Sequence, residues 1–267
     1  MRSGETLYID TSPFMPDVNL EVANTCGTLF WDLVISWTGV GGQATYVSTN
    51  GQIPCGQWDS LDWVTIGYYG GTATIQWYVT APNGTTPGSG TFTFTIAGTN
   101  PPPSSVDALA SVPWFFENII QWESKYRQFD SSGNPLNCNC PNGIGLTQLD
   151  PPFTNNDFWD WVNNVEDGLL MVLTPKQALA YASWSNELAQ MIATTGSSPV
   201  YPRTTSYSYC SFAYPQSNND SYADGDWIHA YNGGYYIFWD PPANGVAGFW
   251  DIDTNGYVAS VCNSKAQ

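Results

Sequence analysis

Glu123 is the carboxylic acid of this sequence whose neighbours best suit proton transfer. Phe116, Ile119 and Ile120 precede it by seven, four and three residues. Residues at these spacings share one face of a helix, so we expect the carboxyl group on an apolar face. Desolvation there would disfavour the carboxylate and raise its pKa, as a general acid requires. The alternative is that Glu123 faces solvent at a helix end.

The run GIGLTQLD at 143–150 places two glycines ahead of the polar pair Gln148 and Asp150. Glycine allows backbone to come close to a ligand or to a packed helix. By itself the run is typical of a glycine-rich turn that caps a helix. Asp150 alone would then be a turn or cap acid ahead of Pro151.

The segment AYNGG at 230–234 carries Tyr231 and Asn232 and is equally compatible with a turn behind a core tyrosine. His229, the single histidine, directly precedes it. No serine or cysteine nucleophile motif accompanies this histidine, so we predict a packed or surface imidazole. Asp130 is a further acid near Glu123 in sequence, but Asp-Ser-Ser-Gly predicts a turn.

The elements that must position these residues change character at the prolines and serines of 101–105, which predict a stiff extended linker. Upstream, several runs are rich in β-branched and aromatic residues and partly alternate: 33–37, 73–79 and 91–96. Such runs, separated by turn signals, predict an antiparallel immunoglobulin-like β-sandwich of about seven strands over 1–100.

Downstream of the linker the hydrophobic period is helical. Within 157–173 the apolar residues fall on one helix face: Phe158, Trp161, Val162, Val165, Leu169 and Leu173. Ser111 with Pro113, and Thr174 with Pro175, predict helix starts because proline suits the first turn. We therefore expect a mainly α-helical domain over 106–267.

Together and in this order, Glu123-Ser124, the run at 143–150 and the segment at 230–234 resemble the goose-type lysozyme and lytic transglycosylase family. In that family a Glu-Ser helix end, a G-x-G-L-x-Q segment and an A-Y-N-x-G segment line one groove. Partial matches lie outside these segments: Asn164-Val165, Gly168 and Tyr257-Val258. The resemblance covers most of 112–262 and none of the N-terminal domain.

The resemblance implies a role for each matching residue. Glu123 would be the general acid, with Ser124 beside it supporting the site. Gln148 and Asn232 would hydrogen-bond the sugar or its N-acetyl group. Tyr231 would touch the glutamate and hold its orientation. The implied substrate is peptidoglycan, cut at the β-1,4 bond between N-acetylmuramic acid and N-acetylglucosamine, without metal or cofactor.

Asp150 separates two versions of this chemistry. An inverting hydrolase needs a second carboxylate to activate water, whereas a lytic transglycosylase uses the substrate's own C6 hydroxyl and leaves a 1,6-anhydro ring. Asp150 follows Gln148 by two residues, as the water-positioning aspartate of goose-type lysozymes does. A second assisting aspartate of that family would fall near Asn139, where this chain has no acid. Hydrolysis is favoured; the alternatives are a lytic transglycosylase that uses Glu123 alone and a non-catalytic wall-binding protein.

The net charge and the cysteine content limit the possible partners and the cellular compartment of the protein. A net charge of −17, from 23 acids against 6 bases, argues against nucleic acid and anionic membrane as partners. Six cysteines without a CxxC pair favour disulfides in a secreted or periplasmic protein. We expect Cys26 to pair with Cys55, and Cys138 and Cys140 each to join one of Cys210 and Cys262, in either order.

The sequence thus predicts an α+β multidomain glycoside hydrolase. Its parts would be an immunoglobulin-like β-sandwich at 1–100, a linker at 101–105 and a lysozyme-like catalytic domain at 106–267. We expect it to act as a monomer on peptidoglycan.

Overall fold

The computed structural model describes most of the chain and assigns it a mixed α and β fold. The described residues are 3–21, 27–39, 44–54, 57–80, 88–111, 113–137, 143–196, 205–209, 211–212, 224–234, 236–253 and 256–264. They group into two compact units. Unit 1 comprises Met1–Pro102 and Tyr126–Asn164, and unit 2 comprises Pro103–Lys125 and Val165–Gln267.

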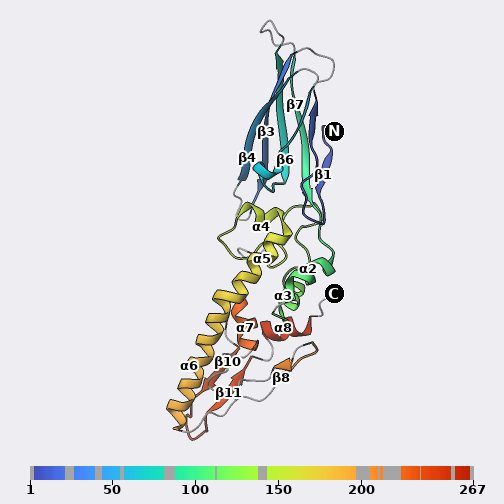
Figure 1. The fold of residues 1–267 in the computed structure, drawn as a ribbon. Helices are drawn as coiled ribbons and strands as arrows, with labels where there is room; N and C mark the ends of the chain where they lie inside the picture. Colours follow the sequence, from blue (N-terminus) through green and yellow to red (C-terminus); the bar gives the residue numbers. More distant parts are fainter. Residues whose placement is uncertain are drawn as a thin grey trace. The chain divides into compact units, whose positions relative to one another are not determined.

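The centre of unit 1 is a five-stranded sheet in the order β1-β7-β6-β3-β4 (Figure 1). The strands are β1 (Thr6–Ile9), β3 (Thr28–Thr38), β4 (Ala44–Ile53), β6 (Gly71–Thr80) and β7 (Gly88–Gly98). β1 runs parallel to β7, while the other neighbours are antiparallel. A second, two-stranded sheet pairs β2 (Asn19–Glu21) with β5 (Trp58–Ser60).

Alternation along β3 shows why this sheet forms. Leu29, Leu33 and Ile35 are buried, whereas Asp32 and Val34 between them are exposed. A strand presents successive side chains to opposite faces, so one face of β3 enters the core and the other meets water. The three runs from which strands were predicted lie within β3, β6 and β7, which confirms these strands.

The segment Tyr126–Asn164 packs against this sheet region through aromatic rings that lie directly on glycine residues, in space that a side chain there would need. A Cβ on Gly98 would lie 2.2 Å from the Phe129 ring, and a Cβ on Gly70 would lie 2.1 Å from the Trp159 ring. Trp159 belongs to α4 (Asn155–Trp159), whose Thr154 cap accepts a hydrogen bond from the backbone of Asp157. These close contacts explain why the segment groups with unit 1.

The compact units divide the chain differently from the predicted domains. The sequence predicted one boundary at 101–105. In the structure the chain passes from one unit to the other after Pro102, and again after Lys125 and after Asn164. Pro103, predicted as linker, begins the helix α2 (Pro103–Ala110), as proline is able to do in a first helical turn. The domain boundaries at 1–100 and 106–267 remain a prediction.

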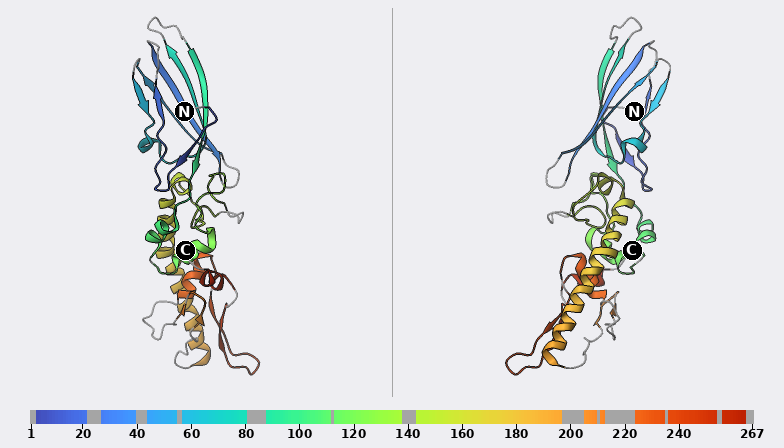
Figure 2. Two further views of the ribbon diagram at one scale, coloured as in Figure 1. Left: turned by 90° about the vertical axis from the view of Figure 1, so that its right-hand side faces the viewer. Right: turned by 60° about the vertical axis from the view of Figure 1, so that its left-hand side comes forward.

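Unit 2 is mainly helical, with short strand pairs. Its elements are α2, α3 (Phe116–Ser124), η2 (Val172–Lys176), α6 (Gln177–Thr195), β8 (Thr205–Ser206), β9 (Ser211–Phe212), α7 (Asp224–Tyr231), β10 (Ile237–Asp240), β11 (Phe249–Ile252) and α8 (Tyr257–Asn263). The helix α5 (Trp161–Met171) begins in unit 1 and ends in unit 2. Both views of Figure 2 show the β10–β11 hairpin alongside α6.

The predicted helix start at Thr174-Pro175 is wrong. α5, the π-helical segment η2 and α6 follow one another without a break, with Pro175 inside η2. Proline has no N–H and its ring crowds the preceding turn. The wider π turn accommodates this: the Gln177 N–H reaches back to the carbonyl of Val172, five residues earlier.

The β10–β11 hairpin is attached to α6 by stacked indoles. Trp184 of α6 stacks on Trp250 at 5.4 Å between ring centroids, and Trp250 meets Trp239 edge-on at 5.3 Å. The backbone N–H of Trp239 also donates to Glu187 Oε2 on α6, at 2.6 Å. The hairpin is therefore fixed to α6 by both apolar and charged contacts.

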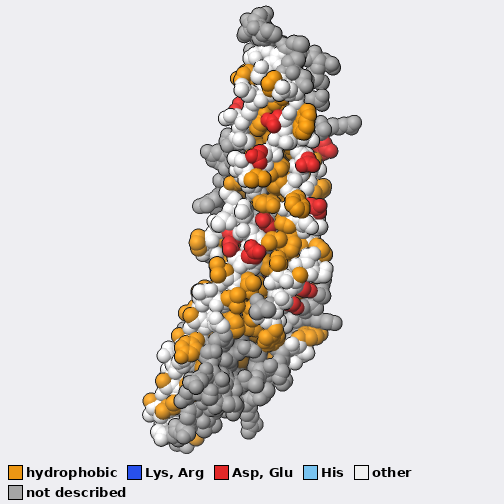
Figure 3. Space-filling model, in the orientation of Figure 1, with side chains coloured by type: hydrophobic (Ala, Val, Ile, Leu, Met, Phe, Trp, Pro, Cys, Tyr) orange, Lys and Arg blue, Asp and Glu red, His pale blue; other side chains and the backbone are white. Residues whose placement is uncertain are grey.

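Within the described residues, no helix is long and apolar enough to cross a membrane. On the face in view in Figure 3, acidic side chains are interspersed with hydrophobic and uncharged ones. Cys262 is disulfide-bonded. The other five cysteines lie outside the described residues, so the predicted pairings stay predictions.

Candidate functional site

Glu123 lies in the last turn of α3, on a helix whose apolar side is fully buried. Phe116, Ile119 and Ile120 are each 0% exposed, while Glu123 itself is half-buried. Ser124 is buried and its hydroxyl donates back to the carbonyl of Ile120 at 3.1 Å. The carboxyl group thus starts from a rigid helix end.

Tyr257, the first residue of α8, holds this carboxyl group. Its hydroxyl donates to Glu123 Oε1 at 2.5 Å, and α3 and α8 are in contact. Desolvation raises the pKa of Tyr257 well above 10, and the neighbouring Glu123 carboxylate and Tyr231 raise it further. The phenol therefore remains a hydrogen-bond donor at every physiological pH.

His229 and Asp253 extend this cluster. The Nε2 atom of His229 lies 3.6 Å from Asp253 Oδ2, and its ring meets the Tyr257 ring edge-on at 6.2 Å between centroids. Gly234 leaves room for the imidazole, since a Cβ there would lie 2.0 Å from it. The sequence predicted a packed or surface imidazole, and the structure has a packed one, with 13% of the side chain exposed.

The AYNGG segment forms the end of α7 and the turn after it. Tyr231 closes α7, is buried, and meets Phe116 of α3 edge-on at 6.4 Å. Asn232 is exposed, and its N–H donates to the carbonyl of His229 in the turn. Tyr231 thus packs against the helix that carries Glu123, while Asn232 presents its amide to solvent.

In unit 1, the run GIGLTQLD forms a tight reversal in which Ile144 and Leu149 exchange two backbone hydrogen bonds. Gly145 and Gln148 adopt positive φ angles of 67° and 49°. The Gln148 side chain donates to the carbonyl of Gly145 at 2.7 Å. Its Oε1 atom is buried and has no hydrogen-bond partner within the described residues.

Two fully buried amides fix this reversal. Gln128 accepts from the Leu146 N–H at 3.0 Å and donates to the carbonyls of Asp157 and Phe158. Asn164, the first of the partial family matches, accepts from the Thr147 N–H at 3.0 Å. It also donates to the carbonyls of Ile144 and Asp157, each at 3.2 Å. We call Gln128 and Asn164 the amide latch.

Asp150 and Asp130 differ in their surroundings. Asp150 is exposed at the end of the reversal, where its carboxylate meets solvent. Asp130 accepts from the N–H groups of Ser132 and Asn134 at 2.7 and 3.0 Å. The predicted turn at Asp130 is therefore confirmed.

The predicted site residues divide between the two units. Glu123, Ser124, Tyr231 and Asn232 belong to unit 2, whereas Gln148 and Asp150 belong to unit 1. Three participants did not follow from sequence reasoning: Asp253, Gln128 and the donor role of Tyr257. One sequence feature could have pointed to Asp253: it lies four residues before Tyr257, and a glycine occupies position 256. A Cβ at that position would collide with the Asp253 carboxylate.

Within the described part of the chain, no group of three or more His, Cys, Asp or Glu side chains could hold a metal ion. The chemistry available in unit 2 is that of one oriented carboxyl group with a phenol, an imidazole and a second carboxylate nearby. Comparisons with protein-family models, curated proteins and solved structures find no match for this chain.

Proposed function

We propose that this protein is a peptidoglycan-cleaving muramidase that hydrolyses the β-1,4 bond between N-acetylmuramic acid and N-acetylglucosamine. Glu123 acts as the general acid. The observation that carries the proposal is the hydrogen bond of 2.5 Å from the Tyr257 hydroxyl to Glu123 Oε1. An acid that must deliver a proton to one glycosidic oxygen has to be held in one orientation, and this bond supplies that restraint.

In the proposed reaction, Oε1 stays hydrogen-bonded to the phenol and Oε2 carries the proton to the bridging oxygen. The bond to the leaving sugar then breaks as positive charge develops on the ring. Asp150 is the candidate base that the sequence resemblance assigns, and in an inverting hydrolase such a base takes a proton from the water that attacks the anomeric carbon. The resemblance also assigns sugar binding to Gln148 and to Asn232, and Tyr231 packs against Phe116 of the helix that carries Glu123.

The same proposal assigns the finer fold and the setting of the protein. The seven strands from β1 to β7 support an immunoglobulin-like sandwich, and the order of the three motif segments supports a lysozyme-like arrangement around Glu123. The disulfide at Cys262 supports a secreted or periplasmic location. Peptidoglycan is the partner, and the protein acts as a monomer without cofactor.

Mass spectrometry of soluble products from purified peptidoglycan tests the proposal. We expect the wild-type protein to release fragments with reducing muramic ends, and Glu123→Gln to release at least a hundredfold less, because an amide has no acidic proton to give. Glu117→Gln is the matched control, since Glu117 lies on the same helix. Absence of product from the wild type would leave the non-catalytic wall-binding alternative.

A lytic transglycosylase is the second candidate, because the Glu123–Tyr257 pair lies within unit 2 and needs no second carboxylate. Asp150→Asn separates the two. Hydrolysis should fall at least tenfold in this variant, whereas formation of 1,6-anhydro ends should be unchanged. Asp32→Asn, an exposed acid on β3, serves as the control.

A further inference from the structure

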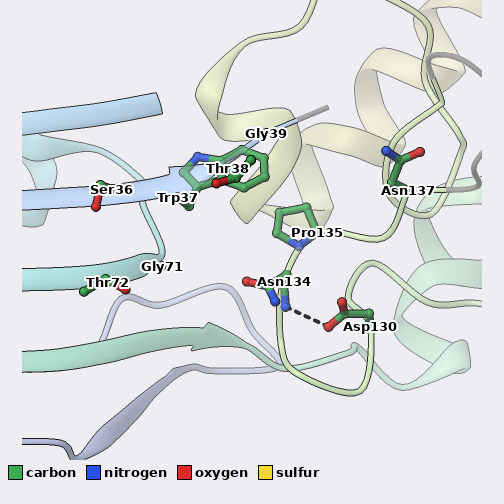
Figure 4. Close-up of a pocket in the computed structure, with 10 residues that line it drawn as sticks. All are labelled: Ser36, Trp37, Thr38, Gly39, Gly71, Thr72, Asp130, Asn134, Pro135 and Asn137. Carbon is green, nitrogen blue, oxygen red and sulfur yellow. Dashed lines mark hydrogen bonds between the residues drawn. The ribbon is translucent and has the colours of Figure 1, made fainter. Parts of the chain in front are cut away.

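Unit 1 contains a cavity of about 620 Å³ where β3 ends and β6 begins. Its lining side chains come from the two strands and from the loop 130–137 (Figure 4). They include Ser36, Trp37 and Thr72 on the strands and Asn134, Pro135 and Asn137 on the loop. None of these residues belongs to the proposed catalytic set.

The walls of this cavity are held in place by backbone contacts. At the start of β6, Gly71 has φ 107°, and a Cβ there would lie 2.4 Å from the carbonyl oxygen of Ser36. The loop is held by the Asp130 turn and by the Gly98 N–H, which donates to the carbonyl of Gly133 at 2.8 Å. The cavity is therefore preformed, as small-ligand sites usually are.

Trp37 gives the cavity an apolar surface. Phe158 and Trp159 meet its ring edge-on at centroid distances of 4.8 and 5.4 Å, which fixes the indole. The side chain is nevertheless partly exposed. Trp37 and Pro135 both line the cavity and are its ring-bearing side chains among the described lining residues (Figure 4).

The other described lining side chains are uncharged apart from one acid. Hydroxyls come from Ser36, Thr38 and Thr72, amides from Asn134 and Asn137, and the carboxylate of Asp130 is already hydrogen-bonded to its own turn. The described lining residues include no lysine or arginine. With a net charge of −17, this composition disfavours an anionic ligand and suits a neutral one rich in hydroxyl groups.

We propose that this cavity is a saccharide-binding site for a neutral N-acetylated hexosamine. A pyranose ring presents an apolar face to Trp37 and hydroxyl edges to the surrounding polar side chains. The Asn134 and Asn137 amides bond the acetamido group, whose methyl contacts Pro135. This site goes beyond the proposed catalytic function, because it binds sugar in unit 1 whether or not Glu123 cleaves it.

The test is an NMR titration of the full-length Glu123→Gln protein with the tetramer of N-acetylglucosamine, read at the indole N–H of Trp37. This N–H is buried and has no hydrogen-bond partner within the described residues, and its resonance is assigned with Trp37→Phe. We expect the resonance to shift on titration. Thr72→Arg, which fills the cavity, should weaken this binding at least tenfold.

Thr91→Arg is the matched control, since Thr91 is exposed on the same sheet and does not line the cavity. It should bind as tightly as the parent protein. Ser36→Arg replaces Thr72→Arg if that variant loses its dispersed spectrum. An anionic galacturonate oligomer should leave the Trp37 resonance unmoved.

A stationary Trp37 resonance while the tetramer binds elsewhere would overturn the proposal, as would equal affinity in the Thr72 and Thr91 variants. Failure of the catalytic proposal is scored separately, by the absence of product from peptidoglycan.

Discussion

Tyr257 and Glu123 lie 134 positions apart in the sequence, and their hydrogen bond joins α8 to α3. Its geometry needs a phenol that stays protonated, because an ionised phenolate could not donate to a carboxylate. Desolvation, together with the charge of Glu123, secures this by raising the pKa of Tyr257. The environment that orients the glutamate therefore also keeps its partner in the donating form.

The raised pKa predicts an alkaline loss of stability. Since the folded protein holds this proton more tightly than the unfolded chain, whose tyrosines titrate near 10, stability falls as the pH rises above about 10. At pH 11 the wild-type protein should have lost on the order of 1 kcal/mol through Tyr257 relative to pH 8.

Urea unfolding at pH 8 and pH 11 measures this loss. Tyr257→Phe should lose less than the wild type, and Tyr181→Phe, at an exposed tyrosine of α6, should behave as the wild type does. Equal losses in Tyr257→Phe and the wild type would contradict the assignment.

Sequence reasoning reached this pair only in part. The helical spacing placed Glu123 near Phe116 and Ile120, and the family resemblance noted Tyr257. Neither pattern contains the approach of α8 to α3, which depends on tertiary packing. For the same reason the resemblance gave the orienting role to Tyr231, whose predicted contact with Glu123 stays a prediction.

At the scale of elements, the amide latch determines the shape of the 143–150 reversal. Gln128 and Asn164 form hydrogen bonds with backbone groups of the turn that would otherwise be buried without a hydrogen-bond partner. A buried amide that satisfies several backbone groups is costly to remove, because each lost partner keeps its desolvation penalty. The latch therefore stabilises unit 1 and also positions Gln148.

We predict that Asn164→Ala lowers the free energy of unfolding by about 2–4 kcal/mol, since it strips partners from Thr147, Ile144 and Asp157. Asn156→Ala, on the exposed side of α4, should change it by no more than about 0.5 kcal/mol. Chemical unfolding of both variants provides the comparison. A similar small change in each would show that the latch carries no stability.

The sequence predicted helices and strands correctly where the spacing of apolar residues follows a single period. β3, β6 and β7 followed from partial alternation, as in β3, where Leu33 and Ile35 are buried while Asp32 and Val34 are exposed. The helix start at Thr174-Pro175 failed because the proline signal is the same whether a helix begins or widens into a π turn. The latch could not be predicted, since Gln128 and Asn164 accept from the N–H groups of Leu146 and Thr147, which lie 18 and 17 residues away in the sequence.

At the scale of the molecule, unit 1 is built from two separate stretches of chain. Residues 126–164 supply Phe129 and Trp159, whose rings lie over Gly98 and Gly70 of the sheet region. A sheet that lacks them would expose the apolar surface that these rings cover.

We predict that the fragment 1–164 unfolds cooperatively and keeps the near-ultraviolet circular dichroism of packed tryptophans. The fragment 1–100, which lacks 126–164, should lose both signals and bind a hydrophobic dye. Cooperative unfolding of the shorter fragment would instead show that the sheet is stable alone.

Because these rings lie on glycines, which substitutions are tolerated at a glycine depends on the residue that supplies the ring. Any side chain at Gly98 would occupy the space of the Phe129 ring, so a larger residue is tolerated only after Phe129 has become smaller. A smaller residue at 129 opens a cavity that a side chain at 98 could then fill. Substitutions at the two positions are therefore epistatic, and the same holds for Gly70 and Trp159: evolution can pass through the small–small intermediate but not through the large–large one.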